Sequence, residues 1–279
     1  MKKDMDTDND IDLTDDQSEE MQDEALTITP WQQAASPRLI NSKVDGILRK
    51  CYSTIDKNTI PRSLKDYVTI INVPGDITWI SDHGLAFCPK LESVELPSGL
   101  RNLGDFALYG CRTLKTVDIP SGVRGIGKMA FGACSGLESV NIPESITTIG
   151  DRAFFHCEKL ESITIPSGVT TIGNETFEAC SSLKTVNIPE GLAFIGDGAF
   201  SRCSSLRSVK LPGSVTQIGE YAFSNCPINS IIIPAGIKYV GEGAFLGCRE
   251  HMLVYVPASL NKKILMNAKF PRTARFRLT

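Results

Sequence analysis

Nine prolines divide most of this chain into segments of nearly equal length. Successive prolines lie 23 residues apart, with a single step of 22, at Pro74, Pro97, Pro120, Pro143, Pro166, Pro189, Pro212, Pro234 and Pro257. A fixed period of about 20–29 residues is typical of a solenoid, in which each repeat forms one coil and buries its apolar side chains against neighbouring coils. The period therefore predicts an elongated stack of coils rather than a globular domain.

Within each repeat, apolar residues recur at the same distances from the proline. Residues 160–165 alternate apolar and polar side chains at their end, which predicts a short parallel strand. Residues 151–157 have helical spacing, which predicts one or two helical turns on the opposite side of the coil. We expect the centre of the core to be a spine formed by Leu85, Leu108, Phe131, Phe154, Phe177, Phe200, Phe223 and Phe245.

A glycine precedes the predicted helical turn in all repeats but the first, where Ser81 takes its place. These glycines are Gly104, Gly127, Gly150, Gly173, Gly196, Gly219 and Gly241. A glycine at a repeated position indicates either a positive φ angle or a close approach of another coil, because both exclude a Cβ atom.

Eight of the nine cysteines also share one repeat position, and they are Cys88, Cys111, Cys134, Cys157, Cys180, Cys203, Cys226 and Cys248. No CxxC pair occurs, so the spacing of common zinc sites is absent. Equivalent side chains of stacked coils lie roughly 4.8 Å apart, which exceeds the ~3.8 Å Cβ separation of a disulfide. We therefore predict a ladder of buried, reduced thiols, with Cys51 belonging to the core of an N-terminal cap.

The two ends of the chain differ from the repeats and from each other. Residues 1–30 carry eleven acidic residues and two lysines, and this polar composition predicts a disordered acidic tail. Residues 31–73 predict an N-terminal cap made of an amphipathic helix and a strand, and residues 74–256 form eight repeats. Residues 257–279 contain six basic residues and no acid, and they predict a basic C-terminal cap.

Both caps have predictable elements. The N-terminal helix is expected to begin at Ser42 and to bury one face formed by Val44, Ile47, Leu48, Cys51, Tyr52 and Ile55. In the C-terminal cap we expect a short helix after Ser259, followed by an edge strand over residues 274–278 that its arginines protect from aggregation.

The acidic tail contains one spacing that is similar to a calcium-binding loop. Asp8, Asp10, Asp12 and Glu19 match the ligand positions of an EF-hand, but Leu13 stands where the loop needs glycine. No amphipathic helix flanks the segment on either side. We therefore interpret it as part of a solvated tail and predict neither a metal site nor a cofactor.

The pattern Ile-Pro-x-x-Val-x-x-Ile-Gly-x-x-Ala-Phe-x-x-Cys-x-x-Leu-x-x-Val recurs over about residues 68–257 and resembles the BspA-like class of leucine-rich repeats. The resemblance implies a right-handed, curved α/β solenoid with a parallel sheet on its concave side. It also implies binding to proteins or extracellular matrix, often at microbial surfaces, and no enzymatic activity. Members that act as adhesins generally carry an export signal, and this chain begins without the apolar segment of one.

Residues two before each repeat proline should face the concave surface. The candidate binding residues at this position are Glu95, Asp118, Asn141, Thr164, Asn187, Lys210, Ile232 and Tyr255. The exposed aromatic and apolar residues at the end of this series favour a contact with a partner. The alternative, which we favour slightly at this point, is that the C-terminal cap folds over Ile232 and Tyr255.

These observations predict a non-enzymatic scaffold that binds a protein or peptide, and the alternative is a structural or adhesin-type surface protein. Catalysis is disfavoured because His83, His156 and His251 occupy different repeats, and the ladder thiols should be buried. Nucleic acid is disfavoured because residues 31–258 carry no net charge. No run is long and apolar enough to span a membrane, and a cytoplasmic location is favoured, with the cell surface as the alternative. The oppositely charged ends predict weak head-to-tail self-association at low salt, and solubility alone is the other interpretation of the tail.

Overall fold

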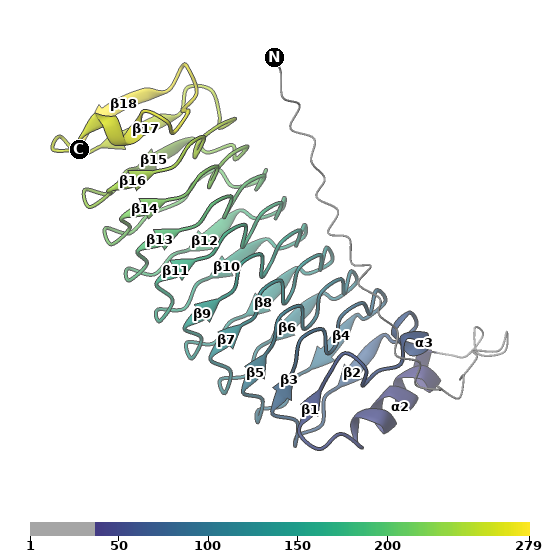
Figure 1. The fold of residues 1–279 in the computed structure, drawn as a ribbon. Helices are drawn as coiled ribbons and strands as arrows, with labels where there is room; N and C mark the ends of the chain where they lie inside the picture. The colour runs from purple at the N-terminus through teal and green to yellow at the C-terminus, as the bar shows by residue number, and fades with distance from the viewer. Residues whose placement is uncertain (1–36) are drawn as a thin grey trace, which may run out of the picture. The chain divides into compact units, whose positions relative to one another are not determined.

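The computed structural model describes residues 37–279, and the acidic tail with its calcium-like spacing lies outside the described residues. No helix within residues 37–279 is long and apolar enough to cross a membrane. The described residues form a parallel β-solenoid in which a regular coil contributes two short strands, although Ser208 forms only an isolated bridge with Ser230 (Figure 1). The two strands of a coil belong to two separate columns.

The first column contains strands of three or four residues and is called the long-strand column. It consists of β2 (Ile70–Asn72), β4 (Ser93–Glu95), β6 (Thr116–Asp118), β8 (Ser139–Asn141), β10 (Ser162–Thr164), β12 (Thr185–Asn187), β15 (Ser230–Ile232), β17 (Leu253–Val256) and β18 (Arg275–Leu278). The second column consists of β1 (Thr54–Ile55), β3 (Trp79–Ile80), β5 (Asn102–Leu103), β7 (Gly125–Ile126), β9 (Thr148–Ile149), β11 (Thr171–Ile172), β13 (Phe194–Ile195), β14 (Gln217–Ile218) and β16 (Tyr239–Val240). Pairing is parallel, and in the regular coils it joins residues one period apart, as in Ser162 with Thr185. The predicted solenoid is confirmed.

The segments predicted as helical turns are hydrogen-bonded turns instead. In one coil, Arg152 and His156 adopt positive φ angles of 56° and 55°, which a right-handed helix does not permit. The N–H groups of Arg152, Phe154 and His156 donate to carbonyl oxygens of the next coil at 2.9 Å. This side of the coil is therefore hydrogen-bonded to its neighbour, as both strand columns are.

The repeated glycines are explained by close approach between coils. A Cβ atom on Gly150 would lie 2.5 Å from the backbone nitrogen of Lys128, and one on Gly127 would lie 2.4 Å from the carbonyl of Gly104. Neither glycine has a positive φ angle. Of the two explanations open from the sequence, the structure supports the steric one.

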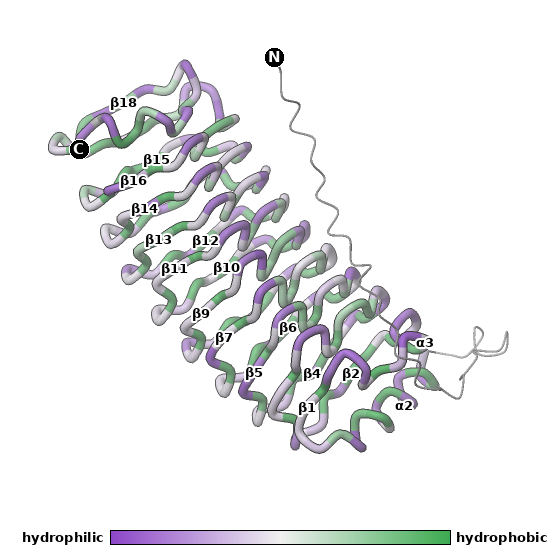
Figure 2. The backbone as a smooth tube through the Cα atoms, in the orientation of Figure 1, coloured by the Kyte–Doolittle hydropathy of each residue, from purple (hydrophilic) through white to green (hydrophobic). Residues whose placement is uncertain are grey.

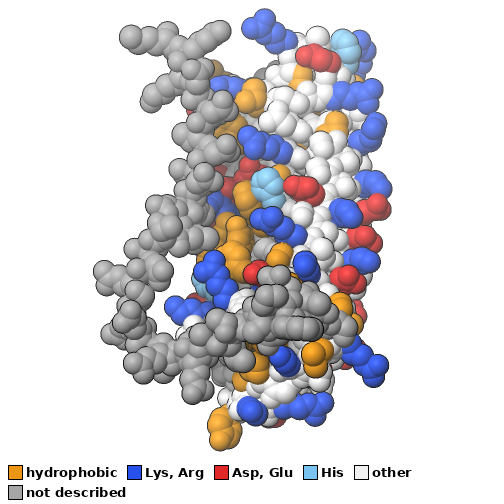
Figure 3. All heavy atoms as spheres, turned by 90° about the vertical axis from the view of Figure 1, so that its right-hand side faces the viewer, with side chains coloured by type: hydrophobic (Ala, Val, Ile, Leu, Met, Phe, Trp, Pro, Cys, Tyr) orange, Lys and Arg blue, Asp and Glu red, His pale blue; other side chains and the backbone are white. Residues whose placement is uncertain are grey.

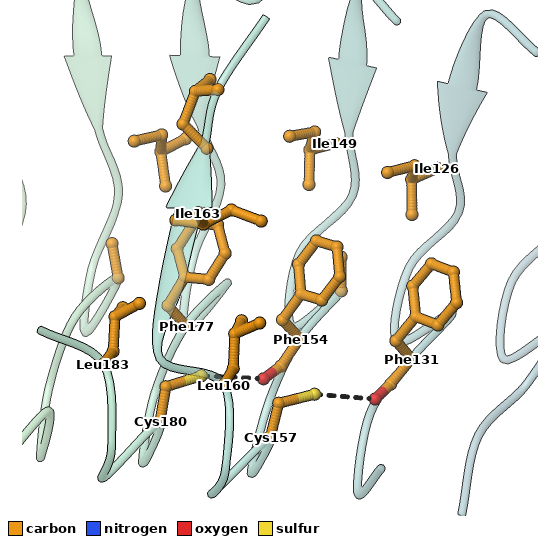
Figure 4. Packing of buried hydrophobic residues seen from close by; sticks show 14 of the residues in the cluster. Ile126, Phe131, Ile149, Phe154, Cys157, Leu160, Ile163, Phe177, Cys180 and Leu183 are labelled. Carbon is orange, nitrogen blue, oxygen red and sulfur yellow. Dashed lines mark hydrogen bonds between the residues drawn. The ribbon is translucent and has the colours of Figure 1, made fainter. Parts of the chain in front are cut away.

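The core is the predicted spine, stacked ring on ring. Phe131, Phe154 and Phe177 are fully buried, with ring centroids 5.3 and 5.4 Å apart (Figure 4). The stack continues through Phe245 to Phe270 in the C-terminal cap, whose ring lies 4.6 Å from that of Phe245. Figure 2 shows hydrophobic and hydrophilic residues alternating along each coil, as expected when one face of every strand and turn packs against this core.

The ladder thiols hydrogen-bond to the spine. Cys157 donates to the carbonyl oxygen of Phe131 at 3.2 Å and Cys180 to that of Phe154 at 3.2 Å, each reaching back to the preceding coil (Figure 4). All eight repeat cysteines are buried and free. The cysteine position thus satisfies a backbone acceptor in a place where water cannot do so.

The N-terminal cap differs from its prediction in detail. Its helix α2 runs over Pro37–Leu48, so it begins before Ser42, and a four-residue helix α3 (Arg62–Lys65) precedes β2. Proline suits a first helical position because it lacks the N–H group that would have no partner there. The helix ends before Tyr52, whose side chain is 94% exposed, and Ile55 is buried in β1 rather than in the helix.

The C-terminal cap contains a 3-10 helix, η1 (Lys262–Leu265), capped by the side chain of Asn261 rather than by Ser259. Strand β18 follows and pairs in parallel with β17. Its residues are all exposed, and it lies at the edge of the three-stranded sheet β15-β17-β18, as the arginine-containing pattern predicted.

Candidate binding face

The long-strand column presents two rows of side chains to solvent. In its typical strand, the middle residue points into the core and its two neighbours point outward, as in β10, where Ile163 is buried between exposed Ser162 and Thr164. Side chains of a strand alternate in direction, and the register of the solenoid aligns equivalent residues of successive coils into rows. Within a row, successive residues lie about 4.8 Å apart. We call these two rows and the surface they form the ladder face.

The predicted site residues form one row of this face. Glu95, Asp118, Asn141, Thr164, Asn187, Lys210 and Ile232 are exposed, and Tyr255 is half-buried. Neighbours in the row are in register, as Thr164 is with Asn187, whose amide donates to the Thr164 hydroxyl at 3.0 Å. Arg277 of β18 extends the row beyond Tyr255.

The other row contains mainly small hydroxyl side chains. They are Ser93, Thr116, Ser139, Ser162, Thr185, Ser208 and Ser230. Such short side chains leave the peptide backbone accessible along the middle of the face. Its two ends differ, with Ile70 at the first coil and Leu253 and Arg275 at the last.

Charge changes sign along the face. Glu95 and Asp118 lie toward the N-terminal end, whereas Lys210, Arg275 and Arg277 lie toward the C-terminal end. The middle contains uncharged amides and hydroxyls. A ligand with its own charge asymmetry would therefore bind in one orientation.

The C-terminal end of the ladder face contains an apolar cluster formed by Ile232, Leu253 and Tyr255. Ile232 is 57% exposed, and its register partner Tyr255 is half-buried. The prediction that the cap folds over both residues is wrong for Ile232. The cap instead adds β18 beside β17, so its arginines border the cluster rather than cover it.

Sequence reasoning missed a second group of surface aromatics, on the turn side of the first coils. The rings of His83 and Phe106 stack at 4.6 Å, and those of Phe87 and Tyr109 meet edge to face at 5.5 Å. Figure 3 shows a side of the molecule where hydrophobic and histidine side chains lie among charged ones. His83, Phe87 and Phe106 have positive φ angles, which no simple sequence signal announces for such residues.

In the central coils of the turn side, Arg152 and Glu175 occupy the repeat position that His83 and Phe106 hold in the first coils. Arg152 donates two hydrogen bonds to Glu175, at 2.7 and 2.8 Å. Although burial alone would raise the pKa of Glu175, these bonds lower it. Burial, then a hydrogen bond to Glu175 and its charge, raises the pKa of Glu178 to about 7.

The buried thiols and the histidines do not form a reaction centre in the described residues. Burial raises the pKa of Cys157 well above its ordinary value and that of Cys180 to about 12, so these thiols stay protonated. Within residues 37–279 no three His, Cys, Asp or Glu side chains lie together as a metal site would require. His83 and His156 lie in separate coils. His83 stacks on Phe106, and the Nδ1 atom of His156 lies 3.7 Å from a carboxylate oxygen of Glu158.

Comparison with known proteins places these features in a family. The chain matches the family described as "BspA type Leucine rich repeat region (6 copies)" over residues 63–184 and 170–268. None of the curated proteins compared with the chain matches it.

Several solved structures share the fold. A leucine-rich repeat protein from Bacteroides ovatus ATCC 8483 is 32% identical with a TM-score of 0.68, and the match covers 77% of this chain and 55% of that one. The T. pallidum leucine-rich repeat protein is 30% identical with a TM-score of 0.52, covering 55% of this chain and 71% of that one. This chain therefore spans about half the length of the Bacteroides ovatus protein.

A leucine-rich cell surface protein from Faecalibacterium prausnitzii A2-165 is also similar. It is 22% identical with a TM-score of 0.38, and the match covers 80% of this chain and 83% of that one.

Proposed function

Because the chain belongs to the BspA-type leucine-rich repeat family, we propose that it is a non-enzymatic scaffold whose ladder face holds a protein or peptide. The observation that carries the proposal is the apolar cluster of Ile232, Leu253 and Tyr255. Large apolar side chains at the surface of a solenoid cost little on their own, but a contiguous group bordered by charge is typical of a contact site.

The surroundings of the cluster indicate the chemistry of the ligand. Lys210 precedes Ile232 in its row, and Arg275 and Arg277 follow Leu253 and Tyr255 in theirs. A ligand that places an apolar side chain on the cluster and acidic side chains beside it would match both features. The hydroxyl-lined middle of the face allows an extended peptide to approach the backbone closely.

The proposal is tested by selecting random peptides of about 12 residues, a length that spans several coils, on the immobilised full chain. We expect enriched peptides to combine an aromatic or aliphatic residue with flanking Asp or Glu. Ile232→Asp should weaken their binding at least tenfold, because it removes apolar contact and adds a repelling charge. The matched control, Thr164→Asp in the same row, should weaken it far less.

Two outcomes would overturn the proposal. One is a selection that yields no peptide dependent on Ile232. The other is equal loss of binding in the Ile232→Asp and Thr164→Asp variants, which would indicate a general charge effect and not a contact at the cluster.

A further inference from the structure

Strand β18 has an open edge. It comes last in the order β15-β17-β18, so within residues 37–279 no strand pairs with its far side. The N–H of Arg275 donates to Met252 and that of Thr279 to Val256, both toward β17. Backbone groups of a strand alternate in direction, so the N–H and C=O groups of Phe276 and Leu278 point to the open edge.

The side chains of β18 also alternate between two chemical classes. Phe276 and Leu278 are in register with the buried Val254 and Val256, on the core side, yet they are 48% and 70% exposed. Arg275 and Arg277 lie on the opposite side, in register with Leu253 and Tyr255. An added strand would satisfy this edge if it placed apolar residues beside Phe276 and Leu278 and acidic residues beside the arginines.

A second copy of β18 does not meet this requirement. Pairing two β18 strands would set arginine against arginine, and like charges in directly opposed positions destabilise a sheet. Arginines at an edge are a common protection against such pairing. The edge is therefore selective for an acidic strand.

The chain itself contains a segment with the required alternation. Asp10-Ile11-Asp12-Leu13 is the one stretch of the sequence in which two acidic residues alternate with two aliphatic ones. In an extended conformation Ile11 and Leu13 would lie on one face and Asp10 and Asp12 on the other. This segment lies outside the described residues.

We propose that residues 10–13 of one molecule add as a strand to the open edge of β18 of another, with Ile11 and Leu13 beside Phe276 and Leu278. The aspartates then pair with Arg275 and Arg277. Such a contact joins two different surfaces, so repeated association forms open chains or rings and not closed symmetric dimers.

Length favours association between molecules. From β2 to β18 the long-strand column takes nine steps of about 4.8 Å, or about 43 Å. Between Leu13 and Pro37 lie 23 residues, and the random-coil behaviour that composition predicts would give them an r.m.s. reach of about 26 Å. The segment reaches a neighbouring molecule more readily than its own distant end.

The test is sedimentation equilibrium of the full chain at a salt concentration of about 0.05 M, with hydrogen exchange as a second readout. The mean mass should rise with protein concentration, and the amides of Phe276 and Leu278 should become protected in parallel. Association should fade above about 0.15 M salt, as screening shortens the range of the charge pairs to about 8 Å.

Two variants separate strand addition from simple charge attraction. Ile11→Asp combined with Asp12→Ile keeps composition and charge but destroys the alternation, and Leu278→Pro removes both an N–H that points to the open edge and an apolar side chain of the proposed contact. Each should weaken association at least tenfold. The control Met266→Asn, at another exposed apolar residue of the cap, should leave it unchanged.

Three results would overturn the inference. The chain could remain monomeric at every concentration, or the rearranged tail variant could associate as strongly as the natural sequence. Protection of Phe276 and Leu278 that does not depend on concentration would place the contact within one molecule. The rearranged variant leaves residues 37–279 unaltered, so a folding defect in the Leu278→Pro protein cannot obscure the answer.

Discussion

Adjacent residues of the turn segments belong to two very different columns. The column containing Phe154 is phenylalanine from Phe131 to Phe245, and every ring is fully buried. The next residue along the chain opens a column that varies from coil to coil, through Gly132, Phe155, Glu178, Ser201, Ser224 and Leu246. Both columns have the same coil spacing, but the N–H groups of the spine donate to the next coil, as Phe154 does to Thr176, whereas those of the second column donate within their own coil, as Phe155 does to Arg152.

The difference shows what the repeat constrains. An interior position meets its own copies above and below, so one residue that stacks on itself satisfies every coil. The outer position ranges from buried Ser201 and Ser224 to Leu246, which is 43% exposed, so its surroundings differ from coil to coil and its residues are free to differ. Properties particular to this chain should therefore be sought in the outer columns and at the ends.

The largest expected effect concerns thiol reactivity. The repeat cysteines are buried, and all but Cys88 donate to spine carbonyls, so a thiol reagent should reach them only when coils open. Opening the core of a domain costs on the order of 5 kcal/mol or more, which slows the reaction by a factor of roughly a thousand or more. Cys51, which is only partly buried, should react much faster in the native protein.

Timed alkylation followed by peptide mass spectrometry checks this expectation. Under non-reducing conditions the eight repeat cysteines should carry no inter-repeat bridge, and they should become modified together on addition of denaturant. Fast modification of Cys157 in the native protein, or a disulfide between adjacent coils, would show that the repeat cysteines are accessible to reagents without unfolding.

The second effect compares two phenylalanines. Phe177 is fully buried between Phe154 and Phe200, whereas Phe87 is 45% exposed in an outer column. Phe177→Ala should lower the free energy of unfolding by about 3–5 kcal/mol, because it leaves a cavity in the stack. Phe87→Ala should cost about 1 kcal/mol, in proportion to the smaller area that it buries. Denaturation midpoints at equal slope measure both, and similar shifts would contradict the assigned register.

The interior could be predicted because each of its positions is specified many times. The proline period, the phenylalanine spine and the cysteine position together fix which side chains of each coil point inward. The buried residues observed agree with that register, from Leu85 to Phe245. The strand pairing and the exposed row containing Thr164 follow from the same register.

The turn conformation and the ends could not be predicted in this way. Alternating positive φ angles at residues such as Arg152 and His156 have no sequence signature, and helical spacing of the apolar residues suggests a helix in their place. The ends occur once each. The repeat pattern therefore does not predict contacts made only at the ends. These contacts determine the start of α2 at Pro37, the exposure of Ile232 and the place of Phe270 in the spine.

The smallest effect we predict concerns a titrating residue in the variable column. Glu178 is partly buried near Glu175, Arg152 and Arg202, and burial followed by its interaction with Glu175 raises its pKa from 4.5 to about 7. A raised carboxyl pKa means that the folded state favours the protonated form. This contribution to stability is therefore complete below about pH 4.5 and is lost as the pH rises through 7.

Glu178→Gln mimics the protonated form, so it should stabilise the protein at pH 8 by about 1 kcal/mol, discounted for partial exposure, and change little at pH 5. Between these pH values Glu175 and Glu144, whose pKa values are lowered, stay ionised and add no slope. Glu138→Gln, at an exposed position, removes the same charge and is the matched control. Denaturation at both pH values decides the question. An equal effect of Glu178→Gln at pH 5 and pH 8 would mean that the surroundings of Glu178 do not keep it protonated near neutrality, and that its carboxylate is as well solvated as that of an exposed residue.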